Sequence, residues 1–425
     1  MTNKKNRAVT ALLSTAAALL TISAARAADV VVAEPEPVEY VRVCDAYGEG
    51  YFYIPGTETC MRISGYVRAD ITGGDNVYAR KRGDIDRDTY AWLTRATLRF
   101  HTASETELGT LRTFVELRSQ WDDGHDTNGG QLRFAFIELG GIRVGLDESI
   151  FNHWTGYYGN VINDDILSPM AYKRTNVISY TFNAGNGFSA ILGVEQGNDD
   201  ADDYGYKYYN EFADGPNGKG HKLSSKIDDY TPNVVGGLKY VQGWGGVSVV
   251  GAYDAYYEEW AAKARLDLNV TDQWSVWVMG GYKSADDYYN GDNTYGSIYK
   301  DKNGKDTNYS YRDRNGLKKF GVYRQVNSIY GDWGGDWAVW GGTTFKFNKK
   351  ASFNAQVAYD DTDTFAASVN VKYELVPGLV ITPELTYISW ENDYSRRDVI
   401  NNEKLVDSKK GQDAFQGMLR IQRSF

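Results

Sequence analysis

Charged residues of opposite sign gather in separate parts of the sequence, in a pattern that suits electrostatics better than covalent chemistry. The basic group consists of Arg68, Arg95, Arg99, Arg112, Arg118 and Arg143, with Lys263 and Arg265 farther along. The acidic group consists of Asp147, Glu148, Asp164 and Asp165. Opposite charges facing each other across a narrow, water-filled passage create a transverse field that orders water and filters dipolar solutes. The alternative is that these arginines pair with carboxylates and simply hold strands and loops together.

The segments that carry the basic residues alternate polar and apolar side chains. Within residues 61–70, Ile63 and Val67 fall on one face, and Arg62 and Arg68 fall on the other. A period of two with one apolar face is typical of a β-strand between two different environments. Residues 111–120 and 365–374 repeat the pattern. Because a basic side chain on a lipid-facing surface near the bilayer midplane costs about 2–4 kcal/mol, we expect the charged faces to point away from lipid.

Alternation also occurs in soluble sandwiches, so the number of strands is the deciding feature. We predict sixteen, near 61–70, 90–101, 109–121, 131–140, 141–147, 175–183, 187–196, 233–242, 245–255, 257–270, 273–284, 335–348, 350–360, 363–375, 378–390 and 412–425. Most approach the roughly 9–11 residues that a tilted strand needs to cross a membrane. Tight turns alternate with connections that are often long, including 71–89, 148–174, 197–232, 285–334 and 391–411. The sequence therefore predicts an all-β fold, a sixteen-stranded antiparallel transmembrane β-barrel.

Aromatic residues near the predicted strand ends support the membrane interpretation. Seven tryptophans lie there, namely Trp92, Trp121, Trp244, Trp260, Trp274, Trp337 and Trp390. Indole rings favour the interface between lipid and water, so we expect these side chains to form outward-facing girdles. Burial in a protein core is the alternative for any single tryptophan. The sequence places Phe425 on an alternating strand, where a terminal aromatic residue resembles the recognition tail of outer-membrane proteins.

The amino terminus has the three parts of a secretory signal peptide. Residues 1–27 contain a basic region, an apolar stretch and a final Ala25-Arg26-Ala27. Its removal would delete four basic residues and no acidic one, which takes the net charge from −10 to about −14. Such acidity argues against nucleic acid as a partner. We divide the chain into the signal peptide, an N-terminal periplasmic segment at 28–60 and a β-barrel pore domain at 61–425.

Cys44 and Cys60 are the only cysteines in the sequence. An exported protein folds in an oxidising compartment, so we expect the two to form a structural disulfide in the periplasmic segment. The redox-active alternative is weaker because the C-x-x-C spacing is absent. His101, His125, His153 and His221 are scattered, so no zinc site is expected. Residues 291–297 resemble part of a phosphate-binding loop but lack its lysine, and no cofactor is expected.

Several stretches of the sequence resemble one family. The segment 33–60 and its continuation to Arg68 strongly resemble the porins of alphaproteobacteria, the group that contains the Brucella and rhizobial porins. Similar matches occur at 104–110 (SETELGT), 161–166 (VINDDI), 234–240 (VVGGLKY), 334–342 (GGDWAVWGG) and 423–425 (RSF). The resemblance spans the mature chain and weakens in the long loops. It implies a homotrimer of sixteen-stranded outer-membrane barrels, each with its third external loop folded into the bore.

The third long connection, 148–174, is accordingly the candidate constriction loop. By resemblance it bends inward and supplies Asp147, Glu148, Asp164 and Asp165 to the acidic side of a constriction. The P-E-F-G-like motif of general porins is absent from it. We expect a passive, water-filled channel in the outer membrane of a Gram-negative bacterium, surrounded by lipid and lipopolysaccharide and open to small hydrophilic solutes and ions. A sugar-selective channel, a non-conducting adhesin or anchor, and a barrel enzyme are the alternatives, and we expect no enzymatic activity.

Overall fold

The computed structural model describes residues 42–79, 82–156, 159–171, 174–197, 230–256, 258–284, 330–391 and 411–425, with isolated positions and short strands between these ranges. The predicted signal peptide lies outside the described residues. So do the acidic loop residues Asp199, Asp200, Asp202, Asp203, Asp286 and Asp287. No helix in the described part of the chain is long and apolar enough to span a bilayer.

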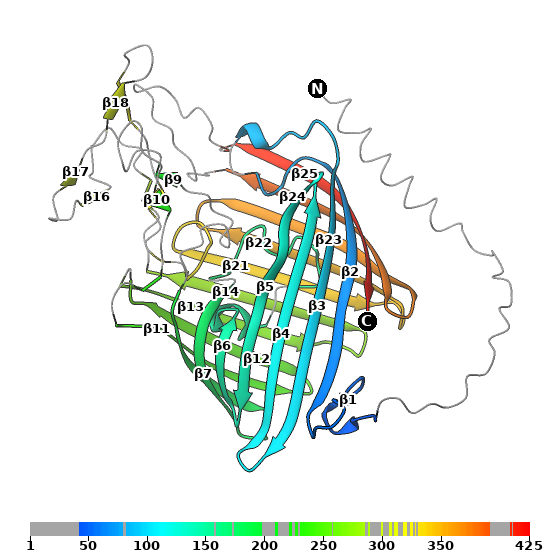
Figure 1. Ribbon diagram of the computed structural model, residues 1–425. Helices are drawn as coiled ribbons and strands as arrows, with labels where there is room; N and C mark the ends of the chain where they lie inside the picture. Colours follow the sequence, from blue (N-terminus) through cyan, green and yellow to red (C-terminus); the bar gives the residue numbers. More distant parts are fainter. Residues whose placement is uncertain are drawn as a thin grey trace, which may run out of the picture.

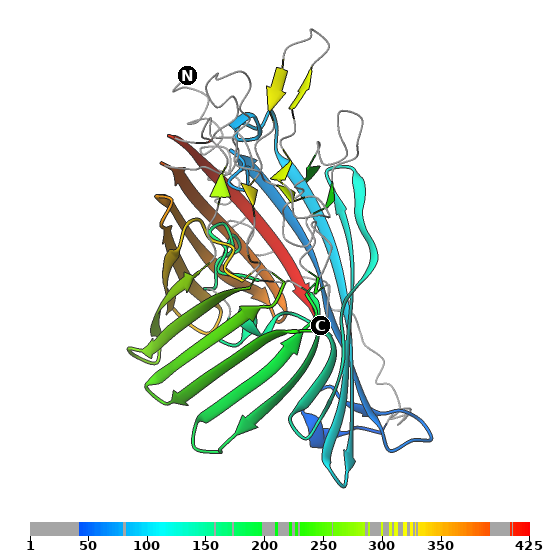
Figure 2. The same cartoon turned by 90° about the vertical axis from the view of Figure 1, so that its left-hand side faces the viewer.

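Sixteen strands of the described chain form one closed antiparallel sheet (Figures 1 and 2). They are β2 (Cys60–Gly74), β3 (Ala91–Thr106), β4 (Gly109–Asp122), β5 (His125–Leu139), β6 (Ile142–Asp147), β7 (Thr175–Asn183), β8 (Phe188–Glu195), β11 (Asn233–Gln242), β12 (Gly245–Asp254), β13 (Glu259–Asn269), β14 (Trp274–Lys283), β21 (Trp337–Lys346), β22 (Ala351–Asp360), β23 (Thr364–Val376), β24 (Leu379–Trp390) and β25 (Gln412–Ser424). The sheet closes because β2 pairs with both β3 and β25. The predicted barrel and its sixteen strands are confirmed.

Shorter elements lie outside the barrel sheet or at its edge. They are η1 (Asp45–Tyr47), β1 (Phe52–Tyr53), η2 (Arg82–Asp84), α2 (Ile150–His153), β9 (Tyr209–Asn210), β10 (His221–Lys222), β15 (Tyr288–Tyr289), β16 (Tyr299–Lys300), β17 (Asp306–Thr307), β18 (Ser310–Arg312), β19 (Lys318–Phe320) and β20 (Arg324–Gln325). Of these, α2 belongs to the candidate constriction loop.

The two ends of the barrel sequence meet at the seam between β2 and β25. The amide of Gly65 donates to the carbonyl oxygen of Phe425 at 2.9 Å, and the amide of Phe425 donates to the carbonyl oxygen of Gly65 at 3.0 Å. The terminal aromatic residue therefore completes the hydrogen-bond ladder that closes the barrel.

The alternation of side chains gives the barrel an apolar face and a polar face. Val67 and Leu98 are 50% and 44% exposed on the first face, whereas Asp70 and Glu116 are 4% and 1% exposed on the second. An apolar outer face suits lipid, and a charged inner face requires water or hydrogen-bonding partners. The polar face is therefore the inner one, and the strand register places its side chains next to one another.

Six of the seven tryptophans assigned to the girdles are exposed, between 38% and 50%. The seventh, Trp390, is 4% exposed, and the ammonium group of Lys409 lies 4.2 Å from its ring centroid. Its assignment to an outward girdle is wrong. Trp390 ends β24 with the parity of the buried residues Thr386 and Ile388, so alternation directs it inward.

The predicted disulfide between Cys44 and Cys60 is confirmed. It ties the described part of the N-terminal segment to the first residue of β2, where Tyr53 of β1 pairs with Cys60. A loop of this size contributes about 3 kcal/mol on the chain-entropy model. The bridge thus holds the small β1 hairpin at the start of the barrel.

Candidate functional site

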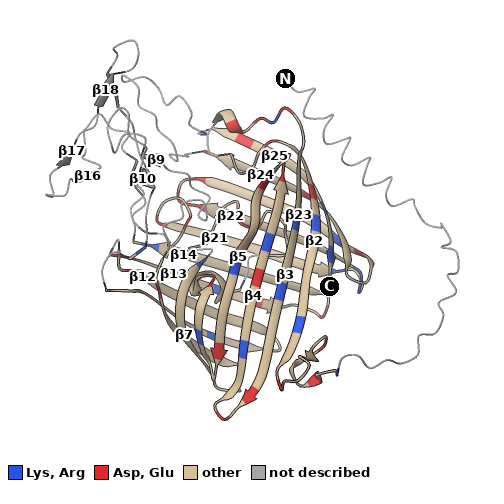
Figure 3. Cartoon of the chain, viewed as in Figure 1, with Lys and Arg blue, Asp and Glu red and all other residues tan. Residues whose placement is uncertain are grey.

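The basic residues predicted from the first strands lie side by side on the inner face of β2, β3 and β4. Arg68 is directly opposite Arg95 in the register, and Arg118 is opposite Thr97, two residues along β3 from both Arg95 and Arg99. Figure 3 shows the charged positions of these strands. We call Arg68, Arg95, Arg99 and Arg118 the basic wall.

Two buried carboxylates organise the basic wall, and sequence reasoning did not single out either. Glu116 binds Arg99 at 2.7 Å and Arg118 at 3.1 Å. Asp70 binds Arg68 at 3.4 Å and Arg420 of β25 at 2.7 Å. These two acids are thus shared among four guanidinium groups. Their positions on alternating strands were the signal that could have revealed them.

Arg95 has a neutral partner on the wall, since its Nε donates to the Gln120 amide oxygen at 2.7 Å. With two carboxylates for five guanidinium groups, the wall together with Arg420 carries an excess of positive charge. Arg112 lies farther along the same face and is exposed near the turn at 107–108. The wall can therefore attract anionic groups and repel cations at short range.

The predicted acidic residues Asp147 and Glu148 stand where β6 ends and the loop begins. Arg143 donates to the Asp147 carboxylate at 2.7 Å and also binds Glu138 at 2.8 Å. Glu148 accepts a hydrogen bond at 3.1 Å from the side-chain amide of Asn152 in α2. Asp147 and Arg143, predicted as members of opposite groups, therefore form an ion pair on the inner face.

Ser149 starts the short helix α2 as its N-cap. Its hydroxyl oxygen accepts from the amide of Phe151 at 3.2 Å, and such caps typically contribute about 1 kcal/mol. The Ser149 hydroxyl in turn donates to Glu195 of β8 at 2.9 Å. Burial of the His153 imidazole at the other end of α2 lowers its pKa, so the ring is neutral at neutral pH. The hydrogen bond between Ser149 and Glu195 thus fixes the helix to the barrel.

The middle of the loop is held by another buried carboxylate, that of Glu384 in β24. The Glu384 carboxylate accepts hydrogen bonds from the backbone amides of Ile162 and Asn163, the second at 2.7 Å. The side-chain amide of Asn163 donates to the Thr386 hydroxyl oxygen at 3.0 Å. Nearby, the Gln356 side chain donates to the carbonyl oxygen of Asp164 at 2.9 Å. Glu384, Thr386 and Gln356 all belong to the polar face of the barrel, in β24 and β22.

The predicted acids Asp164 and Asp165 follow directly after this anchor. Asp165 accepts a hydrogen bond at 2.6 Å from the Tyr78 hydroxyl, which belongs to the connection after β2. Both carboxylates are partly exposed, unlike Glu384. They are separated in the sequence from Asp147 and Glu148, and the loop carries the two acidic pairs to different places along its course.

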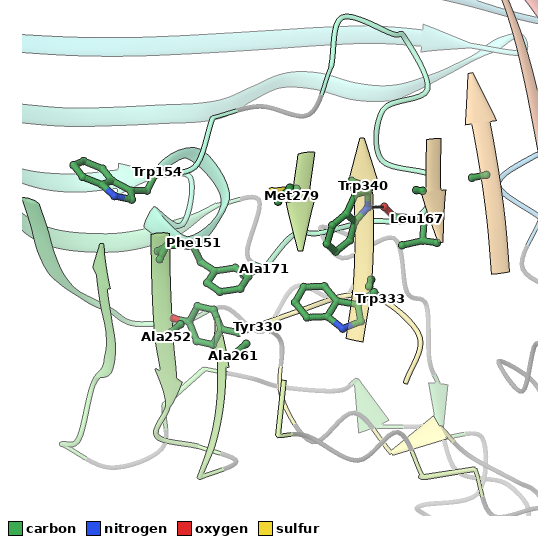
Figure 4. Close-up of a cluster of buried hydrophobic side chains, with 14 of the residues drawn as sticks. Phe151, Trp154, Leu167, Ala171, Ala252, Ala261, Met279, Tyr330, Trp333 and Trp340 are labelled. Carbon is green, nitrogen blue, oxygen red and sulfur yellow. Dashed lines mark hydrogen bonds between the residues drawn. The ribbon is translucent and has the colours of Figure 1, made fainter. Parts of the chain in front are cut away.

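The loop returns to β7 across a cluster of large apolar side chains (Figure 4). The indole of Trp340 in β21 donates to the carbonyl oxygen of Leu167 at 2.8 Å, and Trp333 packs on Trp340 with ring centroids 5.5 Å apart. Phe151 and Tyr330 lie at 5.6 Å, edge to face. The cluster joins this loop to residues 330–333 of the connection before β21.

Lys263 and Arg265 belong to β13, which is not one of the strands of the basic wall. Lys263 is 2% exposed, and its ammonium group donates to the carbonyl oxygen of Pro169 at 2.8 Å. Arg265 binds Asp267 at 2.7 Å and lies over the ring of Trp277 at 4.3 Å. Lys263 thus anchors the returning loop, and Arg265 is held between an acid and an indole.

Comparison with known proteins identifies the family. The sequence profile of the porin subfamily matches residues 29–418. The chain belongs to this porin subfamily. Porin Omp2b of Brucella suis is 47% identical over 424 residues, covering 97% of this chain and 98% of that protein. Porin Omp2b of Brucella abortus (strain 2308) is 46% identical over 425 residues, with the same coverage.

Solved structures support the fold of this porin. The outer membrane channel DcaP of Acinetobacter baumannii has a TM-score of 0.52 and 15% identity, and the match covers 88% of this chain and 99% of that one. A mutant of the Rh. blastica porin has a TM-score of 0.50 and 11% identity, with 86% and 100% covered. Family and fold together place the protein in the outer membrane as a β-barrel porin.

Proposed function

We propose that this porin is a passive, water-filled channel through which small hydrophilic solutes and ions diffuse. The observation that carries the proposal is the basic wall with its buried carboxylates on the inner face of a closed barrel. Charged groups in such number require water or partners, so a dry, filled bore would be costly. We further infer that the protein catalyses no reaction.

The constriction is formed, we infer, by the loop at 148–174 folded into the lumen. Its hydrogen bonds to Glu384, Gln356 and Lys263 support this arrangement, because these side chains belong to the polar face of three different strands. The acids proposed for the constriction are Asp147, Glu148, Asp164 and Asp165, and the opposite charge comes from the basic wall. The resulting transverse field would favour solutes that are small and well hydrated.

We also propose that the chain forms a homotrimer, as its family resemblance implies, with lipid and lipopolysaccharide around the outer face. A signal peptide at 1–27 would direct export, followed by the segment at 28–60 and the pore domain at 61–425. A non-conducting adhesin is the less favoured function, because the charged inner face suits a wet bore.

Liposome swelling tests the diffusion channel. Vesicles that contain the purified protein should swell in isotonic solutions of small neutral solutes, at rates that fall steeply as solute size rises. Protein-free vesicles are the control. Equal swelling rates with and without the protein would contradict the channel and favour the adhesin.

A further inference from the structure

Three phenylalanine side chains lie together on the inner face, where a water-lined wall gives no reason to expect them. The Phe114 ring centroid is 5.2 Å from that of Phe136 and 6.5 Å from that of Phe134, and the His101 ring is 4.8 Å away. All are half-buried. We call Phe114, Phe134 and Phe136 the aromatic patch.

The aromatic patch faces a cavity of about 420 Å³. The cavity is bounded on one side by β2 to β6 and on the other by the start of the loop and α2. Its lining consists of the aromatic patch, Ser64, His101, His153 and six charged side chains. This volume lies within the range of small-molecule sites.

The charged groups of the cavity are equal in number and largely paired with each other. Three guanidinium groups, from Arg62, Arg99 and Arg143, stand against three carboxylates, from Glu116, Asp147 and Glu148. Arg99 binds Glu116 at 2.7 Å, and Arg143 binds Asp147 at 2.7 Å while lying over the Phe136 ring at 4.3 Å. The lining is therefore rich in hydrogen-bond donors and acceptors. With its two histidines left out of the count, it has no net charge.

We propose that this cavity is a binding subsite for neutral sugars of one or two rings. The proposal rests on the proposed channel function and names a solute class for it. The faces of phenylalanine rings carry partial negative charge, which attracts the C–H groups on the flat side of a pyranose ring. The hydroxyl groups at its rim can donate to the carboxylates and accept from the guanidinium groups. The balanced lining itself gives a charged solute no net attraction, so any attraction of an anion comes from the neighbouring basic wall.

The first test is current blocking by maltose in planar bilayers that contain the full-length protein. Maltose should produce reversible, concentration-dependent interruptions of the potassium chloride current. A polyethylene glycol of similar size should produce fewer, because it lacks hydroxyls along its chain and a flat ring. Absence of a maltose effect on an otherwise normal current would overturn the subsite and leave the channel intact, whereas absence of any current would overturn both.

Three phenylalanine-to-leucine variants test whether maltose blocking depends on the aromatic patch. Phe114→Leu and Phe136→Leu keep an apolar side chain but remove the flat ring, and each should weaken maltose blocking by roughly threefold to tenfold. Phe100→Leu is the control, because Phe100 lies on the neighbouring strand with the parity of the outward Leu98. Its maltose blocking and its potassium chloride current should equal those of the unmodified protein. Equal maltose blocking in all three variants would overturn the proposal.

Discussion

At the scale of single residues, the inner face combines a basic wall with carboxylates that differ in burial. Glu384 and Glu195 are buried and bind backbone amides of the loop, so they act as anchors. Asp164 and Asp165 are partly exposed, and we propose that they act on passing ions. Asp147 and Glu148 are each only 8% exposed, so Asp164 and Asp165 are the more accessible of the four acids proposed for the constriction.

Neutralising Asp164 and Asp165 together tests their proposed action on passing ions. The double variant Asp164→Asn, Asp165→Asn should shift the reversal potential in a salt gradient toward anion preference, because it removes negative charge and leaves the basic wall in place. Asp272→Asn, in an exposed turn between β13 and β14, is the control and should leave the potential unchanged. A double variant with the reversal potential of the unmodified protein would remove these acids from the selectivity argument.

At the scale of elements, two connections far apart in the sequence hold each other. Tyr330 donates to the Glu195 carboxylate at 2.8 Å, and that carboxylate also accepts the amide of Ile150 at 2.7 Å. The amides of Gly331 and Asp332 donate to the carbonyl oxygen of Met170 at 3.1 and 3.0 Å. The connection before β21 therefore binds near both ends of the candidate constriction loop. We call these contacts of Tyr330, Gly331 and Asp332 the clasp.

Removing the Tyr330 hydroxyl tests this clasp. Tyr330→Phe keeps the ring packed on Phe151 but loses one hydrogen bond to a carboxylate, a change of about 1.5–3 kcal/mol. Channel closures should become more frequent and should begin at a lower voltage. Tyr359→Phe loses a phenolic hydrogen bond to Asp363 elsewhere on the barrel and serves as the control. Identical closing voltages in the two variants would show that the clasp does not restrain the loop.

Strands could be predicted from the sequence, but the clasp could not. Alternation is a local property, so residues 61–70 or 378–390 reveal a strand without reference to the rest of the chain. Glu384 and Asn163 are 221 residues apart, and Tyr330 and Glu195 are 135 apart, and nothing local relates them. The girdle assignment of Trp390 was wrong for a different reason, because it followed the position of this residue at a strand end and not the alternation of β24, which directs the side chain inward.

At the scale of the whole molecule, closure of the barrel depends on a close approach at the seam. A side-chain carbon at Gly65 would lie 2.2 Å from the carbonyl oxygen of Thr97 and 3.2 Å from the Phe425 ring. The neighbouring backbone carbonyl cannot move without disturbing the ladder between β2 and β3. The seam therefore requires glycine at this position.

Gly65→Val should reduce the yield of folded barrel, because the β-branched side chain cannot fit between β3 and the terminal phenylalanine. The measurement is the heat-sensitive gel mobility that distinguishes folded from unfolded barrels. Gly280→Val is the matched control, since a side-chain carbon there would meet nothing within 4 Å. Similar folded fractions for the two variants would contradict this account of the seam.

The central claim is that the bore enclosed by the sixteen strands is filled with water and conducts. Single-channel recording of the purified protein in a planar bilayer tests it most directly. The account predicts stepwise current increments in potassium chloride that grow with salt concentration and, for a homotrimer, appear in groups of three. A protein that inserts into the bilayer as a folded barrel and passes no current would contradict it.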